Sequence, residues 1–493
     1  MKRILSFLFL TLAGALAGAL AAAEAVKPNV VFILCDDLGI NDLHCYGRPD
    51  HRTPNLDRLA REGMRFTSAY CAQPICSPSR AAILTGKAPA RLHLTTFLPG
   101  RPNTVAQKIL HPEIEMQVGL GEKMLPRYFK EAGYTTAAFG KWHVGGQGFG
   151  PLDQGFDVFQ AGQRNTKPTA TEGGKGEYGL TTLAEQFIET NKDRPFFVYL
   201  AHNTPHIPFA AQPDRIAKNA GAFEPTYAAV IETLDDTVGR LLAKLDALHL
   251  AEKTIVIFTS DNGGLHVPEG PHPRITHNSP YRAGKGFVYE GGLRIPLIVR
   301  WPGRVPAGFV MDAPVINTDW VPTLVELTGQ AAPAGLDGVS LAALLTARGP
   351  VPQRRLYWHF PHYTNQGSRP SGAVRDGNWM LVEYYDTESS ELYDLAADVG
   401  ENNDLAPRNP ERVAVMRAAL AAWRKSVGAQ VNTPNPNFAP ERYRELYVDV
   451  DASRFDPATA DALHWSQMQE WRKGMNAVVS AAGGGKAGKG EKK

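Results

Sequence analysis

Five short apolar runs place the strongest constraint on the fold of this chain. They are rich in β-branched residues and continuous rather than alternating, which suits strands buried on both faces of a sheet. The segments between them carry apolar residues at helical spacing, as in TPNLDRLAREG, LPRYFKEAG and residues 227–250. The pattern predicts an α/β domain over residues 27–345, with a large sheet sandwiched by helices. The five runs are NVVFILC (29–35), YTTAAFG (134–140), FFVYLAH (196–202), TIVIFTS (254–260) and PLIVRWP (296–302).

The pattern changes near Arg355. LYWHF, GAVRDGNWMLVEYY and SELYDL read as short strands, with a turn at Asp376-Gly377-Asn378, and PERVAVMRAALAAWRKSV reads as a helix. We therefore expect a smaller C-terminal subdomain over residues 350–428, an antiparallel sheet plus a helix. Residues 429–480 predict a helical extension, and the low-complexity residues 481–493 predict a disordered tail.

The first 25 residues have the pattern of a secretory signal peptide. Lys2 and Arg3 form a basic tip, an apolar run begins at Ile4, and small residues precede position 25. A retained membrane anchor is the alternative, because the run approaches spanning length, but its A-x-A ending favours cleavage. We expect residues 1–25 to be removed, no stable membrane insertion afterwards, and export to the periplasm or the extracellular space.

The four cysteines do not form a disulfide framework of the kind that staples small exported proteins. Cys45 and Cys71 could form one bridge, and Cys35 lies inside an apolar run, where a buried free thiol is expected. The spacings do not fit a zinc site. Cys76 remains open at this point: it could be a thiolate nucleophile, a buried thiol or the precursor of a modified residue.

Polar side chains follow four of the predicted strands. In open α/β sheets such residues meet at the carboxyl ends of the strands, where ligands bind. Adjacent carboxylates repel one another unless a cation lies among them, and an all-oxygen donor set suits Ca²⁺ or Mg²⁺. Each pair alone could be a turn or a helix cap, but together they favour a metal site. The residues are Asp36 and Asp37, Lys141 and His143, His206, and Asp261 and Asn262.

The segment PICSPSRAAILTG (74–86) predicts a helix whose N-terminus points at Cys76. Ser77 can cap this helix and Pro78 suits its first turn. A helix N-terminus favours an anion, and Arg80 adds a positive charge in the first turn. Hard oxygen ligands and cations are unusual neighbours for a catalytic thiolate.

The run Cys76-Ser77-Pro78-Ser79-Arg80 resembles the C-x-P-x-R signature of the type I sulfatases, whose cysteine is oxidised to formylglycine. Further segments resemble the family's landmarks in order over residues 28–406, which makes chance agreement implausible. The resemblance implies an arylsulfatase-like member of the alkaline phosphatase superfamily, with a large mixed α/β sheet and a smaller C-terminal subdomain. The segments are PNVVFILCDDLG, GYTTAAFGKWHVG, PFFVYLAHNTPHIPF, FTSDNGG, GKGFVYEGGLRIPLIVRWPG and LYDLAADVGENNDLA.

The resemblance also implies roles for individual residues. Arg80 would hold the formylglycine, Lys141 and Lys285 would bind sulfate oxygens, His143 would steady the nucleophile's hydroxyls, and His206 would protonate the leaving alcohol. It implies a sulfated small molecule or glycan as substrate and a formylglycine-generating enzyme as maturation partner. The implied ligands of Ca²⁺, which is favoured over Mg²⁺, are Asp36, Asp37, Asp261, Asn262 and the modified Cys76.

The chemistry of a sulfate ester explains these residue types. The ester is a poor electrophile surrounded by negative oxygens, so cations must neutralise charge as the nucleophile approaches. A hydrated aldehyde carries two hydroxyls on one carbon: one attacks sulfur, and loss of the other's proton then releases sulfate and restores the aldehyde. The alcohol leaves when an acid protonates it, a task that suits histidine.

Several of these residue roles have alternative interpretations. Lys285 could be a solvated loop lysine, and His202 competes with His206 as the acid. A further polar sulfate contact could come from Gln160 or Gln163. The loops at 91–120, 161–180 and 262–284 could line a cleft for an extended anion; their candidates are Arg91, His93, Arg101, Arg164, Lys167, Arg274 and Arg282. Further histidines of open role are His266, His272, His277, His359 and His362.

Two rival functions belong to different classes. A phosphate or phosphonate ester hydrolase would share the fold and metal site, although an amide at Asn262 favours the less charged sulfate. A non-catalytic protein that binds sulfated glycans would be expected to lose Cys76 or Arg80, and both are present. With 52 Lys+Arg against 50 Asp+Glu, the net charge of +2 gives no support for a nucleic-acid partner.

Overall fold

The structure is a computed structural model that describes residues 27–163, 166–331, 333–346, 349–350 and 353–482. The predicted signal peptide (1–25) and residues 483–493 of the predicted tail lie outside the described residues. No helix within the described ranges is both long and apolar enough to cross a membrane.

A nine-stranded mixed sheet forms the centre of the molecule. The parallel strands β1, β4, β6 and β7 were all predicted as continuous apolar runs, and their residues are almost entirely buried. β8 runs antiparallel to β7, and β2 antiparallel to β8, so β2 ends at the same edge as β1 and β7. The order is β10 (Val315–Ile316), β2 (Met64–Tyr70), β8 (Arg294–Arg300), β7 (Thr254–Ser260), β1 (Asn29–Asp36), β6 (Phe196–Pro205), β4 (Thr135–Gly140) and β5 (Val158–Ala161), with β9 (Phe309–Met311) paired to β2.

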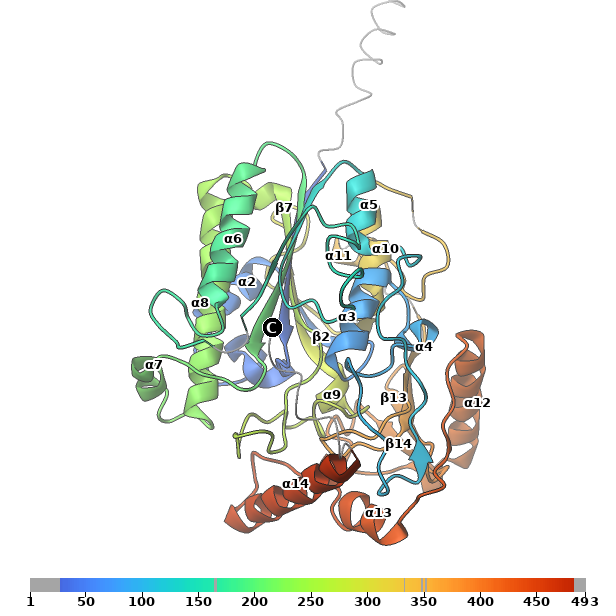
Figure 1. Ribbon diagram of the computed structural model, residues 1–493. Helices are drawn as coiled ribbons and strands as arrows, with labels where there is room; N and C mark the ends of the chain where they lie inside the picture. The colour runs from blue at the N-terminus through green and yellow to red at the C-terminus, as the bar shows by residue number, and fades with distance from the viewer. Residues whose placement is uncertain (1–26, 164–165, 332, 347–348, 351–352, 483–493) are drawn as a thin grey trace, which may run out of the picture.

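Helices cover both faces of this sheet (Figure 1). One layer contains α2 (Pro54–Glu62), α6 (Glu177–Thr190) and α8 (Pro225–Ala247); the other contains α3 (Cys76–Thr85), α5 (Leu125–Glu131), α10 (Trp320–Leu327) and α11 (Ala342–Leu345). Short helices α4 (Pro89–Leu92), α7 (Pro213–Lys218) and α9 (Glu290–Leu293) lie in the connections. Phe32 of β1 is fully buried and packs edge-on against Trp320 of α10, with ring centroids 5.5 Å apart. Burying a side chain of this size contributes roughly 2 kcal/mol, so such contacts hold the layers together.

A second sheet of four antiparallel strands lies C-terminal to the large one. Its turn falls between Asp376 and Trp379, as the sequence predicts. The strands are β11 (Leu356–Phe360), β12 (Ser371–Asp376), β13 (Trp379–Tyr384) and β14 (Ser390–Asp394), and α12 (Pro410–Ser426) packs on them. A two-stranded ribbon of β3 (Ile109–Leu110) and β15 (Thr433–Pro434), then α13 (Pro440–Tyr447) and α14 (Ala462–Ala482), complete the chain. The fold class predicted from the sequence, a large mixed α/β sheet with a smaller antiparallel one, is confirmed.

Candidate active site

Strand register brings two acidic pairs together at the carboxyl edge of the large sheet. Cys35 of β1 lies opposite Ser260 of β7, so Asp36 and Asp37 leave the sheet beside Asp261 and Asn262. The Asp37 amide donates to Asp261 Oδ1 over 3.1 Å, and Asn262 Nδ2 donates to Asp37 Oδ1 over 2.9 Å. All four side chains are buried. The sequence thus builds a dense group of oxygen atoms from two neighbouring strands.

Gly140 allows the segment that carries Lys141 to pass close to β6. It ends β4 with φ of +104°, and a Cβ at this position would lie 1.9 Å from the carbonyl oxygen of Ala201 in β6. Only glycine fits so close a backbone contact at this φ. The next residue, Lys141, donates its amide to the same Ala201 carbonyl over 2.8 Å, and its side chain reaches the acidic pairs.

Cys76 is the first residue of α3 and lies against the acidic pairs. Its Sγ is 3.5 Å from Asp36 Oδ1 and 3.9 Å from Asp37 Oδ1. The predicted helix is present, but the prediction that Ser77 caps it is wrong: Ile75 is the N-cap residue, and Ser77 Oγ accepts a hydrogen bond from the Leu98 amide over 3.1 Å. Ser77 cannot cap because the helix already includes it. Burial raises the pKa of the Cys76 thiol well above its usual value, which disfavours an unmodified thiolate here.

Three cations compensate the carboxylates. Arg80 Nε donates to Asp261 Oδ2 over 2.8 Å, Lys141 Nζ lies 2.6 Å from Asp36 Oδ2, and Lys285 Nζ lies 2.7 Å from Asp37 Oδ2. Burial alone would raise the pKa of the Asp36 carboxyl, but Lys141, with His206 and Arg80, lowers it well below its usual value. Lys285 is 6% exposed, so it is not the solvated loop lysine that was the alternative interpretation.

Two histidines face this group, and their ring nitrogens have different partners. His206 Nε2 lies 3.6 Å from Asp37 Oδ2, while its Nδ1 lies 2.5 Å from the Ile207 carbonyl oxygen. His143 Nε2 lies 2.9 Å from the Leu98 carbonyl oxygen, and its buried Nδ1 has no hydrogen-bond partner among the described residues. Burial, together with Lys141, lowers the pKa of His143 to about 3, so this ring is neutral and its Nδ1 can accept a hydrogen bond.

The donor set fits a hard cation. Single atoms of Asp36, Asp37, Cys76 and His206 lie within 4.8 Å of one another. Asn262 Oδ1 is buried without a hydrogen-bond partner among the described residues, and a metal ion is one group that would satisfy such an acceptor. Carboxylate and amide oxygens are ligands typical of Ca²⁺. The structure therefore brings together every residue that the sequence assigned to the metal and catalytic sets.

Other sequence candidates lie elsewhere. Gln160 and Gln163 are exposed, and His202 is fully buried, with Nδ1 paired to Glu177 and Nε2 3.3 Å from Thr237 Oγ1. All four cysteines are free thiols, so the bridge considered between Cys45 and Cys71 is absent. Arg164 lies outside the described residues.

Lys175 and Glu177 were not predicted from the sequence as functional residues. Lys175 is 5% exposed, and its Nζ donates to the backbone carbonyls of Asn203 and His206. Glu177 is fully buried, pairs with His202 and accepts the Asn203 amide over 2.9 Å. Both therefore support the segment that carries His206. Their only signal was a charged pair within the glycine-rich stretch GGKGEYG.

Comparison with protein-family models shows to which family the chain belongs. The family model described as Sulfatase matches residues 28–330, which include every residue of this site. The chain belongs to the sulfatase family. It is thus a sulfuric ester hydrolase with an alkaline phosphatase-like fold. A second model, N-sulphoglucosamine sulphohydrolase C-terminal, matches residues 283–425 of the sulfatase.

Characterised relatives cover most of this sulfatase. N-acetylgalactosamine-6-sulfatase of Canis lupus familiaris is 35% identical over 379 residues, which are 70% of this chain and 70% of the relative. Arylsulfatase A of Homo sapiens is 34% identical over 455 residues, 78% of this chain and 85% of the relative. The crystal structure of Ps i-CgsB covers 91% of this chain and 99% of its own, with a TM-score of 0.70 and 27% identity; it is also solved in complex with k-i-k-neocarrahexaose.

Proposed function

We propose that this sulfatase is an exported enzyme that removes sulfate from a carbohydrate, using a formylglycine made from Cys76 and a bound Ca²⁺. The observation that carries the proposal is the position of Cys76 at the N-terminus of α3, with its Sγ 3.5 Å from Asp36 and in contact range of Asp37. A cysteine left as a thiol gains nothing from such neighbours. An oxygen nucleophile at the same position would lie among cations and oxygen ligands, which are compatible with a hard, negatively charged oxygen.

Asp36, Asp37, Asp261, Asn262 and the modified Cys76 would hold the ion. Bound there, Ca²⁺ would supply positive charge that polarises a sulfate oxygen and lowers the cost of placing a nucleophile beside carboxylates. The unpartnered Asn262 Oδ1 supports this assignment. Mg²⁺ is the weaker candidate, because it demands near-octahedral geometry and usually keeps several waters.

The cations of the site would stabilise the ester's developing negative charge. Lys141 and Lys285 are both within 3 Å of carboxylate oxygens, and each ammonium has further donor protons for a sulfate oxygen. Arg80 is fully buried and its Nε and Nη2 both face Asp261, which fixes the guanidinium beside Cys76. Fixed donors in a site shielded from water are worth far more than mobile ones in solution.

His206 would act as the general acid. Its Nδ1 hydrogen bonds the Ile207 carbonyl, so the proton to be donated sits on Nε2, the atom nearer to Asp37. Burial and the charge of Lys285 lower its pKa, which makes the ring a stronger proton donor when it is charged. Neutral His143 would accept a hydrogen bond from the nucleophile's hydroxyl at Nδ1 and hold it in position.

The substrate class that we propose is based on what related proteins bind or are named for. One is named for N-acetylgalactosamine 6-sulfate, and the related structure Ps i-CgsB was solved with a neocarrahexaose. A sulfated oligosaccharide or polysaccharide is therefore the substrate we propose for this chain, with aryl sulfates as simple reporters. A cleavable signal in residues 1–25 would deliver the enzyme to the periplasm or beyond, where such glycans occur.

Comparing two esters tests the proposal. Protein secreted from a host with a formylglycine-generating system would be assayed with 4-nitrophenyl sulfate and 4-nitrophenyl phosphate at equal concentrations. We expect kcat/KM to favour the sulfate. Preference for the phosphate would support the rival phosphate ester hydrolase, and binding of sulfated glycan without turnover of either ester would support the non-catalytic alternative.

A further inference from the structure

A cavity of 830 Å³ lies between α12, the small antiparallel sheet and the ribbon of β3 and β15. Its walls come from α12 between residues 417 and 425, from the end of β13 with the turn that follows, and from residues 428–434. None of the described residues that line this α12 cavity belongs to the catalytic site. Figure 1 shows α12 on the side of the molecule away from α6 and α8. A volume of this size is typical of a site that holds a small ligand.

Three cations of α12 line the α12 cavity. Arg417 and Arg424 are two helical turns apart, so their side chains lie on the same face of the helix. Arg417 Nη2 lies 3.1 Å from Glu383 Oε1, and Arg424 Nη2 lies 3.3 Å from Glu383 Oε2, so one buried carboxylate holds both guanidinium groups together. Lys425 is the third cation and is exposed. Only Glu388 adds a further carboxylate to the described lining, which leaves an excess of positive charge.

Both arginines keep donor groups that a ligand could reach. The side chain of Arg417 is 41% exposed and that of Arg424 is 26% exposed. Arg417 directs Nε and Nη2 at Glu383 over 3.2 and 3.1 Å, and its Nη1 has no partner among the described residues. Arg424 has its guanidinium carbon 4.7 Å from the Tyr385 ring centroid, which orients the group without using all five of its donor protons. Oriented guanidinium groups match the oxygens of a sulfate or a carboxylate.

The rest of the wall suits a sugar ring rather than a bare anion. Asn432 Nδ2 donates to the Leu110 and Pro361 carbonyls over 2.8 and 2.9 Å, which fixes the amide and leaves Oδ1 as an acceptor for a hydroxyl. Val431 and Pro434 add apolar surface, and Val431 is 78% exposed. Apolar walls with a few fixed polar groups are typical of small-molecule sites. A sulfated saccharide presents C–H faces, hydroxyls and an anion to such a wall.

The α12 cavity adjoins a segment that reaches the catalytic centre. His359 lines the cavity, and its backbone carbonyl accepts a hydrogen bond from Gln73 Nε2 over 2.9 Å. Gln73 is buried three residues before Cys76, and the same nitrogen donates to the Thr95 carbonyl over 2.9 Å. The cavity is therefore attached to the segment that carries Cys76, although the two sites share no residue.

We propose that the α12 cavity is a second, non-catalytic binding site for a sulfated saccharide. Arg417, Arg424 and Lys425 bind a sulfate group, and Asn432 Oδ1 accepts a hydrogen bond from a ring hydroxyl. The choice of a saccharide rests on the proposed function, because the occupant is a part of the polymer that is not being cleaved. The site increases the affinity for a polymer and does not act on 4-nitrophenyl sulfate, which has no second sulfate to place there.

Calorimetry with full-length Cys76→Ala protein tests the site without turnover. The probe is short-chain dextran sulfate; unsulfated dextran tests the need for sulfate, and polyglutamate supplies an anionic chain without sugar. Arg424→Met and Lys425→Met are made in this background. Arg412→Met is the matched control, because Arg412 is an exposed arginine of the same helix whose guanidinium carbon lies 4.2 Å from the Trp379 ring centroid, outside the cavity. Binding at the catalytic centre is common to all these proteins, so the comparison isolates the cavity.

We expect Arg424→Met to weaken the binding of dextran sulfate about 10- to 100-fold, as the loss of a charged hydrogen-bonding group does. Lys425→Met should weaken it about threefold, because an exposed charge contributes less. Arg412→Met should bind dextran sulfate as its parent does. Dextran and polyglutamate should bind the parent about tenfold more weakly than dextran sulfate, or less tightly still.

Binding of dextran sulfate by folded Arg424→Met and Lys425→Met as tightly as by Arg412→Met would overturn the site. Polyglutamate that binds as tightly as dextran sulfate would overturn the choice of a saccharide. If Arg424→Met fails to fold, hydrogen exchange of the parent decides: dextran sulfate should slow exchange in residues 417–432, and unchanged exchange there would reject the proposal. None of these measurements needs turnover, so absence of sulfate ester hydrolysis by the wild type would count against the proposed function alone.

Discussion

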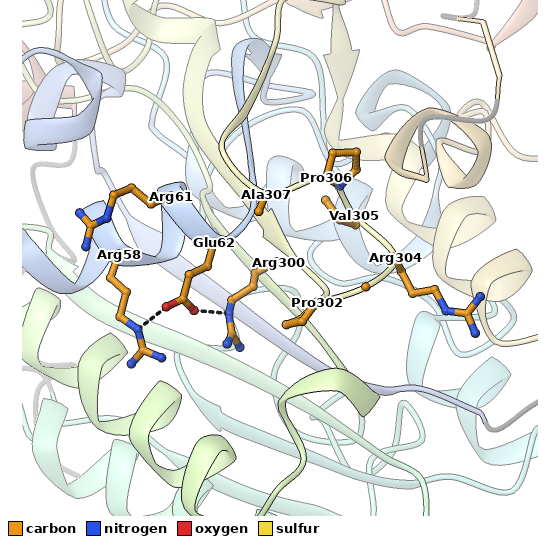
Figure 2. Close-up of a pocket in the computed structure, with 10 residues that line it drawn as sticks. Arg58, Arg61, Glu62, Arg300, Pro302, Arg304, Val305, Pro306 and Ala307 are labelled. Atoms are coloured by element: carbon orange, nitrogen blue, oxygen red, sulfur yellow. Dashed lines mark hydrogen bonds and ion pairs between the residues drawn. The ribbon is translucent and has the colours of Figure 1, made fainter.

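The two edges of the large sheet hold charged residues in opposite ways. At the carboxyl edge, Asp36 is 2% exposed and Asp261 is 0% exposed, and the carboxylates share cations with one another. At the amino edge, Arg58 and Glu62 have side chains 33% and 35% exposed, and Glu62 lies between Arg58 and Arg300 (Figure 2). Water solvates Arg58 and Glu62, so the ion pair between these two residues contributes little to stability. The first group can persist only because its members neutralise each other.

The amino edge also carries a cavity, but that cavity lacks the groups that sulfate ester hydrolysis needs. The pocket in Figure 2 has a volume of 690 Å³ and is lined by four arginines, one glutamate and apolar residues. It contains no cysteine, serine or histidine, and the carboxylate of Glu62 is already paired with Arg58 and Arg300. The carboxyl edge differs because its buried charges neutralise one another beside a reactive residue. The predictions below test this difference, from the largest expected effect to the smallest.

The largest effect is expected for Cys76→Ala. Loss of the nucleophile should lower kcat for 4-nitrophenyl sulfate by a factor of about 10⁴ or more. Cys71→Ala, at another buried free cysteine, should retain activity once its thermal unfolding confirms the fold. Substantial turnover by Cys76→Ala would contradict the assigned nucleophile.

Removal of metal is expected to have the next largest effect. Dialysis against a chelator should reduce activity about 100-fold or more, since an ion that stabilises charge in the transition state contributes several kcal/mol. Adding Ca²⁺ back should restore activity and raise the unfolding temperature, because an ion that binds only the folded state stabilises it. Arg58→Met protein should respond in the same way as the wild type, and chelator-resistant activity would argue against a metal at the carboxyl edge.

Removing one cation at each edge compares the two regions directly. Lys285→Met should lower the free energy of unfolding by about 3 kcal/mol in chelator-treated protein, because it leaves the buried Asp37 carboxylate without its partner at 2.7 Å. Arg58→Met should cost about 1 kcal/mol or less. Denaturant titrations measure both values, and equal losses would remove the distinction drawn between the edges.

The smallest effect concerns acid stability. His111 Nε2 accepts from the Tyr363 amide over 3.1 Å, and burial, with the charge of Arg101, lowers its pKa to about 4. The unfolded chain binds a proton near pH 6.5 and the folded chain does not, so stability is lost as the pH falls from about 6.5 to about 4. His111→Phe should be less stable at pH 7 but lose less on acidification. Exposed His464 supplies the control His464→Gln, which should keep the wild-type pH dependence.

The sequence predicted the features that depend on local pattern and topology. Continuous apolar runs identify strands buried on both faces, and the carboxyl ends of neighbouring parallel strands must meet, which is why Asp36 and Asp261 could be placed together. The resemblance of residues 76–80 to a known signature added the roles. Ser77 was wrongly predicted as the N-cap because the helix begins at Cys76, two residues earlier than a cap at Ser77 would imply.

Contacts between distant segments could not be predicted in this way. The support that Lys175 gives to the His206 segment depends on the path of a loop, for which the chain carries no periodic signal. Arg101 and Arg91 were both loop cations in the sequence, but tertiary packing buries the guanidinium nitrogens of Arg101 and leaves Arg91 paired with Asp337 at the surface.

The mass of the proteolytic peptide that carries Cys76 shows whether this cysteine becomes the formylglycine nucleophile. Protein secreted by cells with a formylglycine-generating system should yield a peptide in which an aldehyde replaces the thiol, lighter by close to the mass of a water molecule. The modified fraction should rise and fall with sulfatase activity across preparations. An unmodified thiol in fully active protein, or in cells where another sulfatase matures normally, would show that Cys76 is not the precursor of the nucleophile.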